Sequence, residues 1–313
     1  MAESALHIGD MFRQEEQFNK ALTWYESANR LSLFLPPTTR SRLALDAECG
    51  RALALRGMGR FQEASKAFAR LVNAYAKIKD RVGQAYTRWA LGTTQRFEGL
   101  IGMAEKNLRR SLRFAAPGND KAYTLCGLGG TLRMKGWAAQ SGRLYQAAQR
   151  LFEREGDLFG LAYAHCGQGN AARMSNRLPS AMRHYRRAIK TYESIGQEGP
   201  LAFVYWSRAQ AEISLGQHGP AKKDLMRAER LFRSVNDKRG LIYVNLGWGT
   251  YYKKAGQARF RSYFQRALRE AQKGGLRLEI LHAKKGLSGK DEKRALQHLG
   301  VDVNKFTAYK TIP

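Results

Sequence analysis

The sequence has few cysteines and few prolines, and it has no long apolar run. Three cysteines in 313 residues do not form the disulfide framework of a secreted domain, so we expect a reducing compartment such as the cytoplasm. Seven prolines and no low-complexity segment leave no obvious linker. No stretch reaches the roughly 18 apolar residues of a membrane-spanning helix, and residues 1–18 lack the apolar core of a secretory signal. The sequence therefore predicts a cytoplasmic protein without integral membrane association.

Acidic residues are also scarce, which leaves a large positive charge. The chain has 54 lysines and arginines against 26 aspartates and glutamates, a formal net charge of +28. The excess grows along the chain, from +5 in residues 1–100 to +9 in residues 101–200 and +14 in residues 201–313. Such a field attracts an anionic partner, which can be nucleic acid, an acidic protein surface or a charged membrane.

A repeat of about 40 residues organises most of the chain. Seven similar segments begin at Ala2, Leu45, Gln84, Lys121, Leu161, Leu201 and Leu241. Each is followed by a second stretch in which a small residue and a bulky residue recur four positions apart, as Ala181 and Tyr185 do. Spacings of three, four and seven lie on one face of an α-helix. Every unit is therefore predicted to be a helix, a turn and a second helix.

Turn and capping residues separate the predicted helices. A residue suited to positive φ follows the first helix of six units: Gly59, Gly99, Gly136, Asn176, Gly216 and Gly256. An aspartate able to accept hydrogen bonds from the first backbone N–H groups precedes four first helices: Asp80, Asp120, Asp157 and Asp237.

This pattern resembles the tetratricopeptide repeat (TPR), in the 40-residue class found in Leu-Gly-Asn-repeat scaffolds and in helical sensor domains of bacterial regulators. The residues that carry the resemblance are Gly9 and Phe12 with Ala21, Tyr25 and Ala28, and Gly169 with Ala181, Tyr185 and Ala188. The resemblance implies an all-α, right-handed α-solenoid with a concave groove. We expect seven TPR-like units over residues 1–275 and a short helical capping pair over residues 276–299.

A tail over residues 300–313 follows the expected capping pair. It carries four apolar or aromatic residues: Val301, Val303, Phe306 and Tyr309. They indicate docking onto the array or onto a neighbouring molecule, and a frayed chain end is the alternative.

No catalytic or metal-binding pattern is present in the sequence. The six histidines show no paired spacing for a metal. The glycine clusters at residues 127–130 and 167–169 have no preceding strand, so they are not predicted to be phosphate-binding loops. Residues 286–291 contain a glycine and a lysine at the wrong spacing for a nucleotide-binding loop. We therefore predict a non-enzymatic protein without cofactor or metal.

A column of basic residues is the most informative feature of the first helices. Positions i, i+3, i+7 and i+10 of each first helix share one face. The last of these positions is basic in six of seven units: Arg13, Arg56, Arg96, Arg133, Arg173 and Lys253, with Ile213 as the exception. A cation in the last turn is also favoured by the helix dipole, by about 0.3–1 kcal/mol. The column therefore has a purely structural explanation beside a functional one.

Aromatic and polar residues fill the other positions of that face. They are Tyr86, Tyr123, Tyr163, Phe203 and Tyr243 at i, Trp89 and Trp206 at i+3, and Asn170 at i+7. The resemblance places this face on the concave groove, where arginine forks suit carboxylates and phosphates. The rings can receive apolar side chains or bases, or they can form the core between adjacent units. The three cysteines share the i+3 column and are expected to be packing residues.

The sequence favours a protein-interaction scaffold whose groove binds an acidic segment of a partner protein. A nucleic-acid-binding solenoid is the first alternative, because the second helices carry further basic residues that few acids balance. A peptide or small-signal sensor is the second alternative, and it follows from the resemblance to helical regulator domains.

Overall fold

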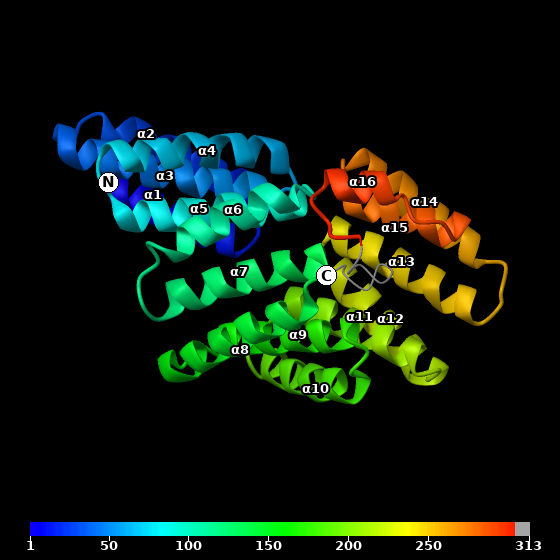
Figure 1. The fold of residues 1–313 in the computed structure, drawn as a ribbon. Coiled ribbons are helices and arrows are strands. Elements are labelled where there is room, and N and C mark those ends of the chain that lie inside the picture. Colours follow the sequence, from blue (N-terminus) through cyan, green and yellow to red (C-terminus); the bar gives the residue numbers. More distant parts are fainter. Residues whose placement is uncertain (304–313) are drawn as a thin grey trace. The chain divides into compact units, whose positions relative to one another are not determined.

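The computed structural model describes residues 1–303, and this part of the chain contains sixteen α-helices and no strand (Figure 1). The first helices of the seven units are α1 (Ala2–Gln14), α3 (Pro37–Gly57), α5 (Arg81–Phe97), α7 (Asn119–Lys135), α9 (Leu158–Met174), α11 (Glu198–Ser214) and α13 (Lys238–Lys254). The second helices are α2 (Phe18–Ser32), α4 (Phe61–Lys77), α6 (Ile101–Leu112), α8 (Ala138–Glu155), α10 (Leu178–Ser194), α12 (His218–Ser234) and α14 (Phe260–Lys273). Helices α15 (Arg277–Ser288) and α16 (Lys293–His298) follow. The all-α solenoid of TPR-like hairpins is confirmed.

The chain divides into two compact units, which we describe separately. Unit 1 consists of Met1–Glu98 and Met103–Ala116, so it holds α1 to α5 and most of α6. Unit 2 consists of Gly99–Gly102 and the chain from Pro117 on, so it holds α7 to α16. The predicted boundaries between array, capping pair and tail stay a prediction, although α15 and α16 occupy the stretch expected for the capping pair.

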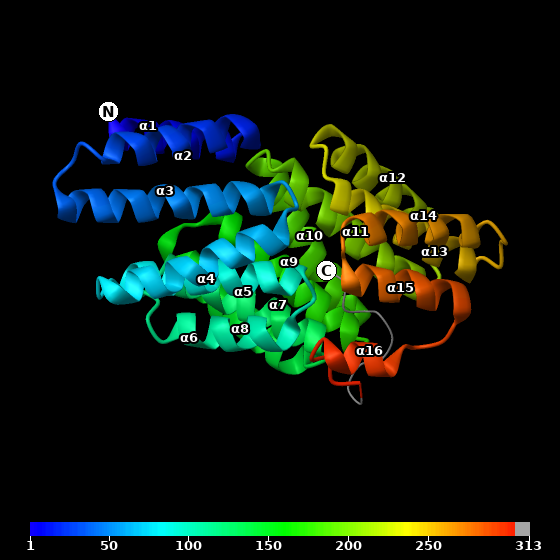
Figure 2. The ribbon, with the colours of Figure 1, turned by 90° about the horizontal axis from the view of Figure 1, so that it is seen from above.

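Each of the two compact units has two layers of helices. The two helices of six hairpins pack on one another: α1 and α2, α3 and α4, α7 and α8, α9 and α10, α11 and α12, and α13 and α14. Figure 2 shows α1 and α2 side by side. Consecutive first helices also contact one another: α1 contacts α3 and α3 contacts α5 in unit 1, and α7, α9, α11, α13 and α15 contact one another in sequence in unit 2. In a curved stack of hairpins the helices on the concave side approach most closely. The odd-numbered helices therefore form the inner layer of each unit.

In four of the seven hairpins, a contact between a glycine and an aromatic ring sets the distance between the two helices. A Cβ atom on Gly9 would lie 2.8 Å from Cε1 of Tyr25, and a Cβ on Gly169 would lie 2.6 Å from Cε1 of Tyr185. The alanines four residues before these rings, Ala21 and Ala181, are fully buried. The recurring bulky residue of the second helix thus packs against the glycine of the first helix.

Most of the predicted turn and cap residues are confirmed. All six residues predicted for positive φ have values between 57° and 104°. Asp80, Asp157 and Asp237 accept hydrogen bonds from the N–H groups of Gly83, Gly160 and Gly240 at 2.9, 2.7 and 2.8 Å. The prediction for Asp120 is wrong, because it lies inside the first turn of α7 and Gly118 occupies the N-cap position.

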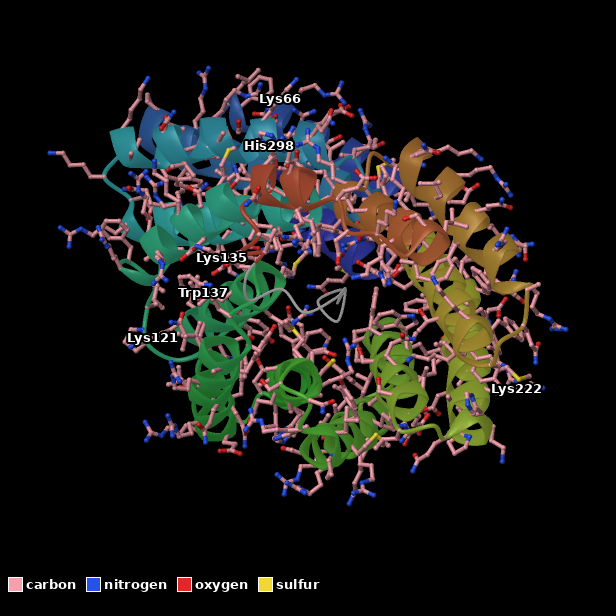
Figure 3. The ribbon with its side chains drawn as sticks, turned by 45° about the vertical axis from the view of Figure 1, so that its right-hand side comes forward. Lys66, Lys121, Lys135, Trp137, Lys222 and His298 are labelled. Atoms are coloured by element: carbon pink, nitrogen blue, oxygen red, sulfur yellow. The ribbon has the colours of Figure 1, made fainter. Side chains whose placement is uncertain are left out.

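The start of the predicted tail docks on the end of α7, within unit 2. The N–H of Asp302 donates to the carbonyl of Lys135 at 3.0 Å, and Nε1 of Trp137 donates to the Asp302 carboxylate at 3.1 Å. Figure 3 labels Lys135 and Trp137, whose ammonium and ring lie 4.3 Å apart. Val301 is buried, so docking is confirmed for this segment, whereas Phe306 and Tyr309 lie outside the described residues. No helix of residues 1–303 has the length and hydrophobicity needed to cross a membrane.

Replacement of Gly169 by alanine tests the glycine–ring contact. The added methyl group would force Tyr185 to move, so we expect the free energy of unfolding to fall by about 1–3 kcal/mol. The matched control is Gly219→Ala on α12, where a Cβ atom would meet nothing within 4 Å. That control is expected to be neutral or more stable by up to about 1 kcal/mol. Urea unfolding followed by circular dichroism measures both, and equal midpoints for the two variants would contradict the packing argument.

Candidate functional site

The predicted basic residues all lie in the last turns of inner-layer helices, but they differ in their surroundings. Arg13, Arg56, Arg96, Arg133, Arg173 and Lys253 close α1, α3, α5, α7, α9 and α13. Arg96, Arg133 and Arg173 are buried, with 8%, 4% and 4% of their surface exposed. Arg13 and Arg56 are half-buried and Lys253 is exposed, so only part of the basic column lies within the packed inner layer.

Arg13 is neutralised within its own hairpin. Its guanidinium donates from Nη2 to Asp10 Oδ1 at 3.0 Å and from Nε to the Tyr25 hydroxyl at 3.0 Å. The Tyr25 hydroxyl in turn donates to Asp10 Oδ1 at 2.7 Å. Because an acid already balances this cation, the predicted role of Arg13 in binding a partner is not supported.

The fifth hairpin has a similar hydrogen-bonded arrangement, with an amide in place of the Asp10 carboxylate. Nε of Arg173 donates to the hydroxyl of Tyr185 at 3.3 Å, and that hydroxyl donates to Oδ1 of Asn170 at 2.9 Å. Asn170 occupies the position of Asp10 in the repeat and has nearly the same shape. It supplies hydrogen bonds to the site but no negative charge.

In unit 1, neighbouring inner helices bring residues of all four columns together. Nη1 of Arg56 on α3 donates to the Thr93 hydroxyl on α5 at 3.1 Å, and the guanidinium lies 5.5 Å from the centre of the Trp89 ring. Tyr86 packs 5.4 Å from Trp89 and is 42% exposed. An arginine, an aromatic pair and a small hydroxyl residue therefore form one continuous surface.

In unit 2, Arg133 and Arg173 both act on the Cys166 thiol. We call Arg133, Cys166, Asn170, Arg173 and His282 the inner cluster. Burial raises the pKa of the Cys166 thiol to about 11, and both guanidiniums act in the opposite direction. Burial lowers the pKa of His282 to about 3, and Lys285 and Arg173 add to that effect. Arg173 on α9 and His282 on α15 thus belong to one electrostatic environment, in which both histidine and thiol are neutral near pH 7.

The predicted aromatic residues divide between surface and core. Tyr123 donates to the Asp157 carboxylate at 2.8 Å, and Tyr163 packs edge-on against Tyr145. These two rings and Phe203 are half-buried. Trp206 and Tyr243 are each 1% exposed, and Nε1 of Trp206 donates to the Tyr243 carbonyl at 2.6 Å. The latter two rings form the contact between adjacent hairpins, so they are not available to a ligand.

Lys253 has a structural role. Its ammonium group donates to the carbonyl of Gly286 at 2.5 Å, near the end of α15. A last-turn cation that bonds the carbonyl of the next inner helix is the structural explanation that the sequence also allowed. The basic column therefore contains both packing and candidate binding residues.

Sequence reasoning missed two side-chain clusters on the outer side of unit 2. Nδ1 of His165 and Nδ1 of His184 lie 3.4 Å apart, on α9 and α10. The rings of Trp248, Tyr252 and Tyr263 form a stack on α13 and α14. The columns that we followed cover one face of each first helix, whereas these residues lie on the opposite face. Among residues 1–303, no three histidine, cysteine, aspartate or glutamate side chains are grouped as a metal site would require.

The Tyr185 hydroxyl holds two members of the inner cluster in place. We expect Tyr185→Phe to lower the free energy of unfolding by about 1–3 kcal/mol, because Arg173 and Asn170 each lose a buried hydrogen-bond partner. Tyr192→Phe is the control, since the Tyr192 hydroxyl is buried without a hydrogen bond to the described residues. Chemical unfolding should show no loss of stability in the control. Equal losses in both variants would contradict the assigned hydrogen bonds.

Comparison with known proteins supports the fold. No protein-family model and no curated protein matches the sequence. A Rap protein complexed with competence and sporulation factor is similar in structure, with a TM-score of 0.70 and 12% identity over 95% of this chain and 85% of that one. The Rap conjugation gene regulator of plasmid pLS20 with the Phr* peptide gives a TM-score of 0.65 and 13% identity over 86% and 73% of the two chains. Aspartyl phosphate phosphatase F from Bacillus subtilis gives a TM-score of 0.52 and 14% identity over 96% and 82%. The chain is therefore a TPR-like helical repeat protein.

Proposed function

We propose that this protein is a non-enzymatic interaction scaffold whose inner layer binds an acidic segment of a partner protein. The observation that carries the proposal is the pair of buried arginines, Arg133 and Arg173, on adjacent inner helices of unit 2. The residue three positions before Arg173 is Asn170, whereas the equivalent residue of the first hairpin is Asp10, which neutralises Arg13. At this position the site therefore offers a hydrogen-bonding amide in place of a carboxylate.

Burial of the inner cluster favours a carboxylate ligand. Charge–charge attraction is stronger where water is excluded, and a guanidinium can bind a carboxylate through two parallel hydrogen bonds. The amide of Asn170, whose Nδ2 lies 3.7 Å from the Cys166 sulfur, is near enough to the guanidinium to bond the same segment. The half-buried rings of Tyr123 and Tyr163 provide apolar surface beside it.

The similar structures support binding of a peptide to this fold. Two of them are complexes, one with competence and sporulation factor and one with the Phr* peptide. We infer an extended or helical acidic segment as the ligand of this chain, because its net charge of +28 is strongly positive. A peptide sensor is the related alternative, and it would bind its peptide on the same inner layer of helices.

The chemistry of the inner cluster supports a binding role rather than a catalytic one. A thiol is nucleophilic only as its thiolate, and burial raises the pKa of Cys166 to about 11. His282, with its pKa lowered to about 3, is neutral but is too weak a base for proton transfer near pH 7. The cluster therefore offers hydrogen-bond donors and fixed positive charge.

A paired charge-removal experiment tests the proposal. Short random peptides are selected on the wild-type protein, and the affinity of the best binder is measured by fluorescence anisotropy. We expect selected sequences to be rich in Asp and Glu. Arg133→Gln with Arg173→Gln should weaken binding tenfold or more, since loss of one partner of a buried ion pair costs about 2–5 kcal/mol. Removal of the same charge from the outer helix α10, by Arg183→Gln with Arg186→Gln, should have little effect. Non-acidic binders, or equal losses in the two variants, would overturn the proposal.

A single isosteric substitution provides a sharper test. Asn170→Asp would give Arg173 the acid that Asp10 gives Arg13, and we expect it to reduce acidic-peptide affinity about tenfold while preserving stability. The reciprocal change in unit 1, Asp10→Asn, removes an acid from the repeat without touching the inner cluster of unit 2. It serves as the control and should not weaken peptide binding. Undiminished affinity in Asn170→Asp would show that Arg173 does not hold the ligand.

A further inference from the structure

Three aromatic rings form a stack on the outer side of the last hairpin. The rings of Trp248 and Tyr252 lie 5.7 Å apart with their planes 21° from parallel, and Tyr252 and Tyr263 lie 5.3 Å apart at 23°. Tyr252 and Tyr263 are half-buried, so each keeps part of its ring at the surface. Tyr251 packs edge-on against both Trp248 and Tyr252 and fixes the base of the stack.

Positive charge surrounds the stack. The Arg259 guanidinium lies 4.5 Å from the centre of the Tyr252 ring and donates to its hydroxyl at 3.0 Å, and Arg266 lies 5.9 Å from the Tyr263 ring. Residues 251–273 contain seven basic residues and one acid, and that acid, Glu270, is paired with Lys273 at 2.9 Å.

Helix α12 borders the stack on its other side. The ring of His218 lies 5.6 Å from Tyr251, and the exposed Lys222, one turn further on, points outward in Figure 3. The Glu229 carboxylate accepts from Nε1 of Trp248 at 3.1 Å and is itself paired with Arg233 at 2.6 Å. We call Lys222, Trp248, Tyr252, Arg259, Tyr263 and Arg266 the aromatic face.

The equivalent site two repeats earlier shows that the fold does not need these rings. The contact of Gly169 with Tyr185 corresponds to that of Gly249 with Phe264, which aligns the two hairpins. Between α8, α9 and α10 the surface has an open groove of about 540 Å³. Five residues that line it are Gly142, Gln168, Ala172, Ser180 and His184, and their counterparts in the last repeat are Lys222, Trp248, Tyr252, Arg259 and Tyr263. Small and polar residues have thus been replaced by rings and cations at a surface position.

We infer that the aromatic face binds single-stranded nucleic acid. Flat rings at the surface stack with unpaired bases, and a basic surround follows the phosphates, which is how sequence-tolerant single-strand binders work. The Tyr263 ring, at the end of the stack, is placed to stack with a base. Arg259, Arg266 and Lys222 are then near the phosphates of the same strand. A duplex hides the faces of its bases, so stacking of this kind discriminates against it. This face lies on the outer side of the hairpins, so it acts independently of the inner cluster.

Anisotropy titration of a labelled uridine oligonucleotide and a matched DNA duplex tests this inference on the full chain. We expect the single strand to bind more tightly, with an affinity that falls steeply with salt. Binding should quench tryptophan emission, and the quenching should disappear in Trp248→Phe. If the duplex and inorganic polyphosphate bound as tightly as the single strand, attraction by charge alone would explain the binding and the inference would be overturned.

Variants taken from the equivalent groove separate stacking from charge. Tyr252→Ala with Tyr263→His restores the residues of the earlier repeat and keeps every arginine, so it should fold and still weaken single-strand binding about tenfold. Arg259→Ser should weaken it as well and should lower the salt dependence. Arg186→Ser on α10 removes the same charge elsewhere and is the control. Wild-type affinity in the two-ring variant, with its helical circular dichroism unchanged, would exclude a stacking role.

Discussion

The close contact between a glycine on one helix and an aromatic ring on the next is the interaction on which the structure depends. Gly9 with Tyr25 and Gly169 with Tyr185 leave no room for a side chain larger than hydrogen. The same contact recurs between Gly129 and Tyr145 and between Gly249 and Phe264, and the first helices pack on one another along each compact unit. The same ring that fills the glycine site carries a hydroxyl, and in two hairpins this hydroxyl holds the last-turn arginine.

Packing and charge are therefore coupled in the inner layer. The ring positions the arginine, and the residue three positions before the arginine is a carboxylate in one hairpin and an amide in the other. Asp10 balances Arg13, whereas Asn170 leaves its position beside Arg173 uncharged. The outer side carries different residues in different hairpins. There one hairpin has a polar groove, and a later one has a stack of rings among arginines.

The period, the helix pairs and most turn residues could be predicted because each follows from local spacing and backbone geometry. The burial and the contacts of individual site residues could not be predicted. Trp206 and Tyr86 occupy equivalent helical faces, yet one is buried between hairpins and the other is 42% exposed, because their neighbours on adjacent helices differ. The salt bridge of Arg13 could be predicted, because Asp10 lies three residues earlier on the same helix. The stack of Tyr252 and Tyr263 joins two helices, so no single helical period reveals it.

A crystal structure of the protein with a selected acidic peptide would test the central claim most directly. The account predicts that peptide carboxylates lie within hydrogen-bond distance of the Arg133 and Arg173 guanidiniums, with the segment along the inner helices α7 and α9. A peptide bound to the even-numbered helices, with both arginines unchanged in their contacts, would contradict it.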